Sequence, residues 1–307
     1  MIDQLKRINL ELTSRCNYNC VSCPTNELLR GKGTMDIDLY KAIFDEAGDK
    51  LERAFLWNYG EPLLHSQVAE LIRYSGKFSA KKVLSTNGWR LEDLEDPESL
   101  RELDELIVSI NGLTPETYSI HQVNGDLEKV LRGIEKIAPI IRDSKTKFTM
   151  QAIAHKGNLD ELRYFEDFAK KCGFDMFVIK SFNVMDRKQD TFHNFVPIGT
   201  EFSRYPHGLQ NPPKIHEGGI YPCEEWMVIN WDGSVNPCCW DYKGEHDFGN
   251  VREQGVYGIW ESMNAFRHRE KIRSKRFLDI CNDCLGSKAV SSCSFTNKGG
   301  KDVNKSI

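Results

Sequence analysis

The sequence predicts an α/β fold: a parallel sheet, open or curled, followed by a smaller C-terminal domain. Three observations predict it. Short apolar runs alternate with helical patterns over the first 180 residues. The pattern changes near Phe182, after which prolines and glycines gather. Six of the ten cysteines fall between residues 223 and 293, which indicates a second, separately organised region. Strands that alternate with helices form parallel sheets with right-handed crossovers.

Composition limits the function classes. The chain has 307 residues and 40% hydrophobic content, enough for a sizeable core. Lysine and arginine number 41 against 45 acidic residues, a net charge of −4, so nucleic acid is not an expected partner. No apolar run approaches the roughly 18 residues of a membrane span. Without a signal-peptide pattern near the N-terminus, we expect a cytoplasmic protein and no membrane partner.

The apolar runs predict six strands, which are Lys6–Leu12, Arg53–Asn58, Lys81–Thr86, Glu105–Ile110, Lys147–Ile153 and Met176–Lys180. The intervening amphipathic patterns predict helices over Asp36–Gly48, Ser66–Gly76, Leu127–Ile141 and Asn158–Cys172. Asp36 is the expected N-cap of the first helix, and Gly173 the expected C-cap of the last. Residues 182–222 show no periodicity and predict a long connector.

Beyond the connector, Met227–Val235 predicts a hairpin around a Trp-Asp-Gly-Ser turn. A single helix is expected over Val256–Arg273. The polar tail from Lys298 is expected to be disordered.

Three cysteines follow the first predicted strand in a C-x3-C-x2-C run, Cys16, Cys20 and Cys23. Three thiolates can hold three irons of a 4Fe–4S cube and leave the fourth iron open to another ligand. A structural zinc site instead needs four ligands in a closed tetrahedron. Zinc or plain structural cysteines remain the alternatives for this group.

With these residues in place, the first two-thirds of the chain resembles the radical SAM superfamily. The resemblance covers about residues 5–200 and implies a partial (β/α)6 TIM-type barrel. It also implies that S-adenosylmethionine (SAM) binds the open iron and is cleaved to a 5′-deoxyadenosyl radical. The motif Tyr59-Gly60-Glu61-Pro62 resembles the family's GGE motif. The resemblance therefore makes Gly60 and Glu61 expected SAM contacts.

Two further motifs end strands three and four, Ser85-Thr86-Asn87-Gly88 and Ser109-Ile110-Asn111-Gly112. In the family the second lies at the SAM ribose, which makes Ser109 and Asn111 expected cofactor contacts. Two positions depart from the family pattern. Ser22 stands where an aromatic residue is usual, and His121 and Gln122 stand where many relatives have an arginine.

A second cysteine group lies in the C-terminal region. The hairpin would bring Cys223 and Cys238 together, and the C-x2-C pair Cys281 and Cys284 supplies two more thiolates. Four thiolates can close a second 4Fe–4S site, although four-cysteine zinc is the alternative. Residues 218–290 resemble the SPASM/twitch extension of radical SAM proteins. Because Cys293 is the only further cysteine downstream, the one-cluster twitch form fits better.

Cys239 adjoins Cys238, and adjacent side chains of an extended segment point to opposite faces. We therefore expect Cys238 to be the ligand and Cys239 to be a spare thiol, either a hydrogen donor to a substrate radical or a packing residue. Cys172 is expected to be a core residue.

These observations predict a barrel over 1–200, a connector and SPASM/twitch domain over 201–297, and a tail over 298–307. The expected cofactors are SAM and two 4Fe–4S clusters. The resemblance implies hydrogen abstraction from a polar small molecule, sugar-like or aminocyclitol-like, with oxidation through the auxiliary cluster. Alternatives are an epimerase that uses a cysteine hydrogen donor, a peptide-modifying maturase and a non-catalytic electron carrier. A flavodoxin or ferredoxin is the expected electron donor.

Overall fold

The computed structural model describes residues 4–185, 188–205, 222–281 and 289–294. The chain forms two compact units, which are described separately. The first contains residues 1–16, 24–84 and 212–284, and the second contains residues 17–23, 85–211 and 285–307.

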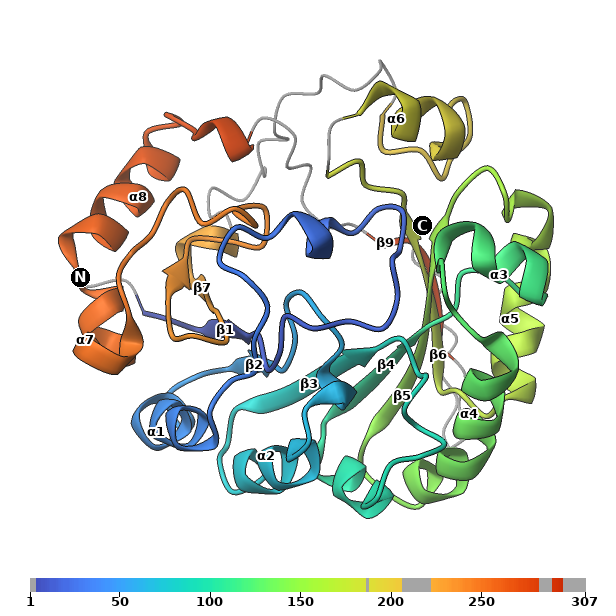
Figure 1. Ribbon diagram of the computed structural model, residues 1–307, viewed down its shortest axis with the longest axis horizontal. Helices are drawn as coiled ribbons and strands as arrows, with labels where there is room; N and C mark the ends of the chain where they lie inside the picture. The colour runs from blue at the N-terminus through green and yellow to red at the C-terminus, as the bar shows by residue number, and fades with distance from the viewer. Residues whose placement is uncertain (1–3, 186–187, 206–221, 282–288, 295–307) are drawn as a thin grey trace. The chain divides into compact units, whose positions relative to one another are not determined.

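The sheet of the first unit is built around β1 (Figure 1). Its strands lie in the order β8-β7-β1-β2-β3, with bounds Val235–Asn236, Trp226–Ile229, Arg7–Leu10, Arg53–Phe55 and Lys81–Thr86. β1 pairs in parallel with β2 on one side and with β7 on the other. In this register, Arg7 lies opposite Arg53 of β2 and Trp226 of β7. The helices are α1 (Ile37–Ala47), α2 (Val68–Ser75), α7 (Val251–Trp260) and α8 (Met263–Arg273), with 3-10 turns η1 (Pro24–Glu27), η2 (Pro62–Leu64), η5 (Pro222–Glu224) and η6 (Asp279–Cys281).

The second unit repeats the pattern of parallel strands with helices. Its strands lie in the order β4 (Glu105–Ser109), β5 (Lys147–Ala154), β6 (Met176–Ser181) and β9 (Ala289–Ser294), the last antiparallel to β6. The helices are α3 (Pro115–His121), α4 (Leu127–Arg142), α5 (Leu162–Lys171) and α6 (Gln189–Phe195), with 3-10 turns η3 (Pro97–Glu102) and η4 (Leu159–Glu161).

Local signals placed several elements correctly. All six predicted strands are present, with their ends moved by three residues or fewer. The Asp36 carboxylate caps α1 by accepting hydrogen bonds from the backbone N–H groups of Asp38 and Leu39. The predicted hairpin is also confirmed, since β7 and β8 are antiparallel and Gly233 in the turn has φ +90°. A positive φ is the conformation that glycine adopts at little cost.

The single helix predicted over Val256–Arg273 is wrong, because two helices occupy this region. The Ser262 hydroxyl accepts a hydrogen bond from the Ala265 N–H and starts α8 as a new helix. α7 is broken at Gly255, whose φ of +71° is not helical, so the helical run after this break starts at Val256, the predicted start. The residues of both helices favour helix formation, so the sequence pattern shows no break between them. The Ser262 cap marks where the second helix begins.

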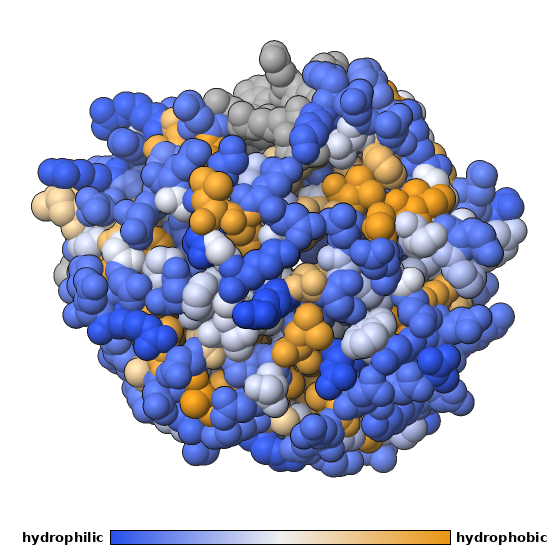
Figure 2. All heavy atoms as spheres, in the orientation of Figure 1, coloured by the Kyte–Doolittle hydropathy of each residue, from blue (hydrophilic) through white to orange (hydrophobic). Residues whose placement is uncertain are grey.

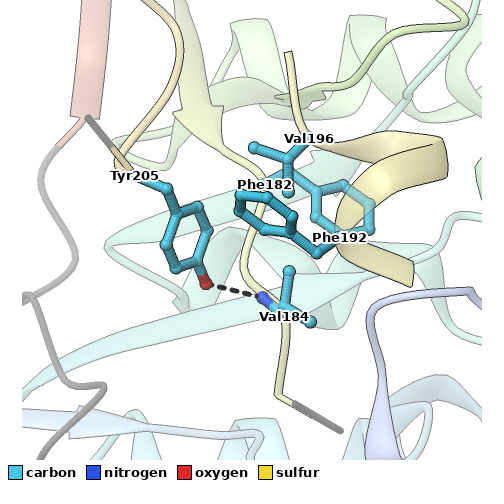
Figure 3. Close-up of a cluster of buried hydrophobic side chains, with 5 residues drawn as sticks. All are labelled: Phe182, Val184, Phe192, Val196 and Tyr205. Carbon is cyan, nitrogen blue, oxygen red and sulfur yellow. Dashed lines mark hydrogen bonds between the residues drawn. The ribbon is translucent and has the colours of Figure 1, made fainter. Parts of the chain in front are cut away.

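The predicted irregular connector is also partly wrong. α6 lies within it, and a buried cluster packs around that helix (Figure 3). The cluster consists of Phe182, Val184, Phe192, Val196 and Tyr205. The Tyr205 hydroxyl accepts a hydrogen bond from the Val184 N–H at 2.9 Å. The apolar residues are spaced too irregularly for a sequence pattern, but they meet in one core. The rest of the connector, residues 206–221, and the predicted tail lie outside the described residues.

The prediction of an α/β fold with a small C-terminal hairpin is thus confirmed, whereas two helices stand in place of the one predicted after that hairpin. Within the described segments, no helix is both long enough and apolar enough to cross a bilayer. On the face shown in Figure 2, hydrophilic residues predominate and apolar residues form small separate groups.

Candidate functional site

The loop between β1 and Cys16 is fixed by hydrogen bonds to Gly33. The Thr13 hydroxyl donates to the Gly33 carbonyl at 2.8 Å, and the Ser14 N–H donates to the same oxygen at 3.0 Å. In return, the Gly33 N–H donates to the Ser14 hydroxyl at 2.9 Å. The segment that leads to Cys16, the first predicted cluster ligand, is therefore held through both its side chains and its main chain.

The Gly60–Glu61 turn docks on this loop. Gly60 has φ +83°, and a Cβ atom at this position would lie 2.0 Å from the Thr13 carbonyl oxygen. The next residue, Glu61, donates its N–H to the Arg15 carbonyl at 2.8 Å. Only glycine allows so close an approach of two backbone segments. The motif predicted to contact SAM therefore lies directly against the residues preceding Cys16.

The Glu61 side chain is 2% exposed and has a structural role. Its Oε1 accepts a hydrogen bond from the Leu63 N–H at 3.0 Å and so caps η2. A contact between this carboxylate and the SAM ammonium stays a prediction.

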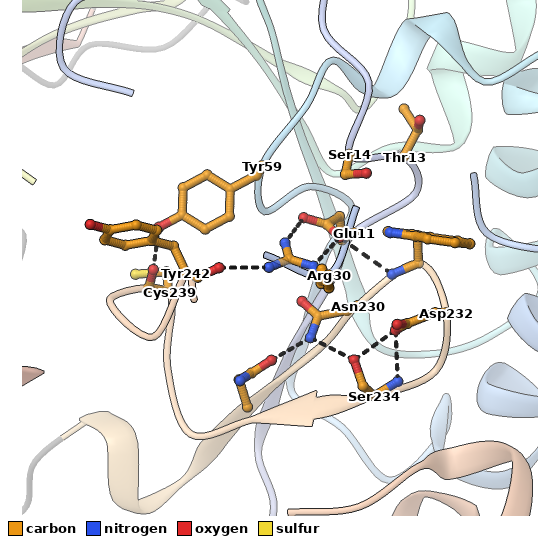
Figure 4. A network of polar contacts seen from close by, with 12 residues as sticks. Glu11, Thr13, Ser14, Arg30, Tyr59, Asn230, Asp232, Ser234, Cys239 and Tyr242 are labelled. Atoms are coloured by element: carbon orange, nitrogen blue, oxygen red, sulfur yellow. Dashed lines mark hydrogen bonds and ion pairs between the residues drawn. The ribbon is translucent and has the colours of Figure 1, made fainter. Parts of the chain in front are cut away.

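A buried charged pair lies at the end of β1 (Figure 4). Arg30 binds the fully buried Glu11 through two nitrogens, Nη2 to Oε1 and Nε to Oε2, the latter at 3.1 Å. The third donor, Arg30 Nη1, reaches the Tyr242 carbonyl at 2.9 Å. Burial raises the pKa of Glu11, and the Arg30 charge and hydrogen bonds oppose that rise.

Tyr59 connects the same region to the second cysteine group. Its hydroxyl donates to the Cys239 carbonyl, and its ring meets that of Tyr242 edge-on at 6.4 Å between centroids. The Arg30 guanidinium lies 5.9 Å from the Tyr59 ring centroid. These contacts place β1, the turn after β2 and the segment Cys238–Tyr242 in one network (Figure 4).

The turn after Cys238 is also fixed from within. The Asp241 N–H donates to the Cys238 carbonyl at 3.2 Å. The buried Asp241 carboxylate accepts hydrogen bonds from Asn236 Nδ2 at 2.7 Å and from the N–H groups of Glu245 and His246 at 2.9 and 3.0 Å. Because each acceptor oxygen has a donor, burial of this carboxylate is compensated.

In the second unit, the other half of the cysteine loop is fixed to the end of α3. The N–H groups of Asn19 and Val21 donate to the carbonyls of Val123 and His121 at 3.0 and 3.1 Å. The Ser22 hydroxyl lies 2.8 Å from His121 Nε2. Ser22, which departs from the family's aromatic pattern, is thus used as a polar link.

Asn111 is the centre of a second network, which is neutral. Its Oδ1 accepts the Ile153 N–H at 2.7 Å, so its Nδ2 is the donor to His121 Nδ1 at 2.9 Å. His121 then carries its proton on Nε2 and donates it to Ser22. His121 and His155 stack at 5.7 Å, and burial lowers their pKa values to about 3 and about 4, so both rings are neutral at pH 7.

The predicted ribose contacts lie at this strand end. The Ser109 carbonyl accepts a hydrogen bond from Gln122 Nε2 at 3.0 Å, and the Asn111 N–H donates to Gln122 Oε1 at 2.9 Å. Asn111 is 1% exposed. The roles of Ser109 and Asn111 at SAM stay predictions.

The predicted iron ligands fit iron–sulfur chemistry in kind, because all are cysteines, and those among the described residues lie on irregular or 3-10 backbone. Cys16, Cys20, Cys223, Cys238 and Cys281 are half-buried, and Cys23 is exposed. Cys284 lies outside the described residues, and nothing is described of the Cys293 side chain. Within the described ranges, no three cysteine, histidine or acidic side chains form a preassembled metal-binding group.

Sequence reasoning missed Arg30, His155 and the buried role of Glu11. Glu11 carried a signal, since it is a carboxylate within the apolar run Ile8–Leu12. A charge in such a run is buried only with a partner, although the sequence does not identify that partner.

This arrangement defines an α/β protein in which each unit holds one part of a cysteine-rich loop by hydrogen bonds. The family model described as the radical SAM superfamily matches residues 10–168, just over half of the chain. The model described as an iron–sulfur cluster-binding domain, SPASM, matches residues 221–285. The chain therefore belongs to the radical SAM superfamily, and it carries a SPASM domain. Its cofactors are SAM and a 4Fe–4S cluster, together with auxiliary iron–sulfur in the SPASM domain.

Two curated relatives are similar over most of the chain. One is a tungsten-containing aldehyde ferredoxin oxidoreductase cofactor-modifying protein of Pyrococcus furiosus, 27% identical over 91% of this chain and 87% of the relative. The other is an AdoMet-dependent heme synthase of Methanosarcina barkeri, 28% identical over 95% of this chain and 92% of the relative.

Solved structures share the fold. BtrN in complex with AdoMet and 2-DOIA is 17% identical with a TM-score of 0.56, and covers 99% of this chain and 100% of BtrN. SuiB of Streptococcus suis bound to its precursor peptide SuiA is 15% identical with a TM-score of 0.64, and covers 94% of this chain and 73% of SuiB.

Proposed function

We propose that this enzyme abstracts a hydrogen atom from a polar small molecule, sugar-like or aminocyclitol-like, and oxidises it with an auxiliary 4Fe–4S cluster as electron acceptor. One observation carries the proposal. β7 continues the sheet beside β1 in parallel register, from Arg7 opposite Trp226 to Leu10 opposite Ile229. The cysteines flanking this hairpin are therefore built onto the same sheet as the strand that leads to Cys16.

In this proposal, Cys16, Cys20 and Cys23 hold the first cluster, and Cys223, Cys238, Cys281 and Cys284 hold the auxiliary one. Gly60, Glu61, Ser109 and Asn111 contact SAM. When bound, these groups supply the 5′-deoxyadenosyl radical that removes a hydrogen atom, and an acceptor for the electron lost as the substrate radical releases a proton.

The remaining protein-level assignments belong to the same proposal. Residues 1–200 form the SAM barrel and residues 201–297 the connector and one-cluster twitch domain. The protein is cytoplasmic and receives electrons from a flavodoxin or ferredoxin.

A second candidate function is modification of a protein-bound or free cofactor. It is favoured by the two curated relatives, whose names denote cofactor modification and heme synthesis and which align over 91% and 95% of this chain. A product assay should therefore include tetrapyrrole and pterin-type cofactors beside aminocyclitols, nucleotide sugars and peptides.

Iron analysis tests the cluster assignments. Anaerobically reconstituted protein should bind about eight irons and eight sulfides, and replacing Cys16, Cys20 and Cys23 with alanine should halve both. The triple variant should also lose reductive cleavage of SAM to 5′-deoxyadenosine. Cys172→Ala is the matched control, since this half-buried thiol lies outside both groups. About four irons in the parent, or zinc at the second site, would contradict the proposal.

The fate of the substrate radical separates oxidation from epimerisation. An oxidase releases a product that lacks two hydrogens and contains no solvent deuterium at the reacting carbon. If Cys239→Ala still forms 5′-deoxyadenosine but loses product, and the parent's product carries one deuterium from heavy water, Cys239 is a hydrogen donor. That result would replace oxidation by epimerisation.

A further inference from the structure

We propose that Tyr59 is a positioning residue that couples the SAM-binding turn to the auxiliary-cluster ligand segment. It does so by holding the Cys239 carbonyl, and therefore the neighbouring Cys238, against the Gly60–Glu61 turn. The inference rests on the proposed role of Cys238 as a cluster ligand.

The ligand segment has two anchors outside itself (Figure 4). The Tyr59 hydroxyl binds the Cys239 carbonyl, and Arg30 Nη1 binds the Tyr242 carbonyl at 2.9 Å. Between these two carbonyls lies Asp241, whose carboxylate is saturated by three donors of its own unit. The segment cannot shift toward or away from β1 without breaking at least one of these contacts.

The other end of the connection is equally fixed. Gly60 is in backbone contact with Thr13, and the Glu61 N–H binds the Arg15 carbonyl, so the backbone of Tyr59 has little freedom. A continuous set of contacts therefore runs from the residues before Cys16, through the turn, to the residue after Cys238.

A side chain that served only for packing at position 59 would not need the hydroxyl of tyrosine. The residue is 7% exposed, and its ring already packs against Tyr242 and Arg30. A buried phenol needs a partner for its O–H, and here that partner is the Cys239 carbonyl. The tyrosine stands where the GGE motif has its first glycine.

Because Tyr59 joins the two cofactor regions, a displacement of the turn on SAM binding is passed to the ligand segment, and the coupling must be reciprocal. SAM binding should shift the reduction potential of the auxiliary cluster. In return, the enzyme should bind SAM with different affinity when that cluster is reduced and when it is oxidised. The ratio of the two affinities corresponds to the shift in potential.

The test uses reconstituted holoenzyme and the variant Tyr59→Phe, which removes only the hydroxyl. Amide hydrogen exchange of residues 238–243 should accelerate about two- to tenfold, the range for one net hydrogen bond, while the hairpin 226–236 is unchanged. The electron paramagnetic resonance signal of the auxiliary cluster should change, and the SAM-induced shift of its potential should be lost.

Tyr74→Phe is the matched control, because it removes a tyrosine hydroxyl that donates to Asp45 at 2.6 Å in the same unit. It should leave the exchange of residues 238–243 and both cluster signals as in the parent. Arg30→Lys, which keeps a charge beside Glu11 but cannot span Glu11 and Tyr242 together, should accelerate the same amides.

The outcomes separate the two levels of the proposal. A parent with only four irons refutes the auxiliary-cluster assignment, whatever Tyr59 does. A parent with eight irons, combined with unchanged exchange and unchanged auxiliary signal in Tyr59→Phe, overturns the role of Tyr59 alone. An equal SAM-induced shift in parent and variant overturns the coupling.

Discussion

The two halves of the cysteine loop are held by different kinds of network, one built on a buried ion pair and the other on neutral side chains. In the first unit, the loop before Cys16 adjoins a buried ion pair, Glu11 with Arg30. In the second unit, the loop around Ser22 is bound to two stacked neutral histidines through His121. A buried ion pair is costly to break because either partner alone is an uncompensated charge, whereas a neutral network loses only hydrogen bonds.

The largest expected effect tests the charged network. Glu11→Gln leaves the Arg30 guanidinium, 9% exposed, without its carboxylate partner, and should reduce the free energy of unfolding by about 3–5 kcal/mol. Glu70→Gln is the control, since this glutamate pairs with Lys41 at 2.9 Å on the surface, where solvent screens the pair, and it should change stability far less. Chemical denaturation measures both. Equal effects would show that Glu11 and Arg30 do not form a buried charge pair.

A second comparison isolates the docking of the turn on the loop. Gly60 and Gly31 have similar positive φ values, +83° and +77°, but only Gly60 has backbone within reach of a Cβ atom. Each alanine substitution pays about 1–2 kcal/mol for the left-handed conformation, so Gly31→Ala should cost that much alone. Gly60→Ala should cost at least about 1 kcal/mol more and should weaken SAM binding. Equal losses in the two variants would argue against a tight contact with Thr13.

The neutral network should be less sensitive. His121→Phe keeps a ring in the stack but removes the acceptor of Asn111 Nδ2 and the donor to Ser22. Leaving buried polar groups without partners costs about 1–3 kcal/mol. His193→Phe, at an exposed position, should fall within about 0.5 kcal/mol of the parent. A loss for His121→Phe as large as that for Glu11→Gln would erase the distinction between the networks.

The smallest effect is a difference in pH response. His121 and His155 have folded pKa values below the usual 6.5, so below pH 6.5 the unfolded chain binds more protons than the folded chain. Their contribution is complete above pH 6.5 and declines toward about pH 3 for His121 and about pH 4 for His155, by up to about 1.4 kcal/mol per pH unit for each histidine. Glu11 has the opposite sign, because its raised pKa favours the folded state at lower pH. His121→Gln should therefore flatten the loss of stability between pH 6.5 and 5, and an unchanged slope would contradict the assignment.

The strands and the cysteine spacing could be predicted because their signals are local. Short apolar runs identified β1 to β6, and three cysteines within eight residues identified the loop. The networks could not be predicted, because each joins residues from distant parts of the sequence. Arg30 meets Tyr242, and Asn111 meets His121 only because α3 returns to the end of β4. Ser22 departs from the family pattern in the sequence, but the sequence does not identify its partner, His121.

The pairing of β7 with β1 has a consequence for synthesis of the chain. Lys6 at the edge of β1 meets Glu225 beside β7, and the two are separated by 219 residues. At roughly 5–20 residues per second, one edge of β1 stays unpaired for roughly 10–40 seconds after that strand leaves the ribosome. An unpaired parallel edge is a template for association with other strands. The auxiliary-cluster hairpin is thus also the segment that closes this edge, so a chain terminated after residue 205 should aggregate before any cofactor is inserted.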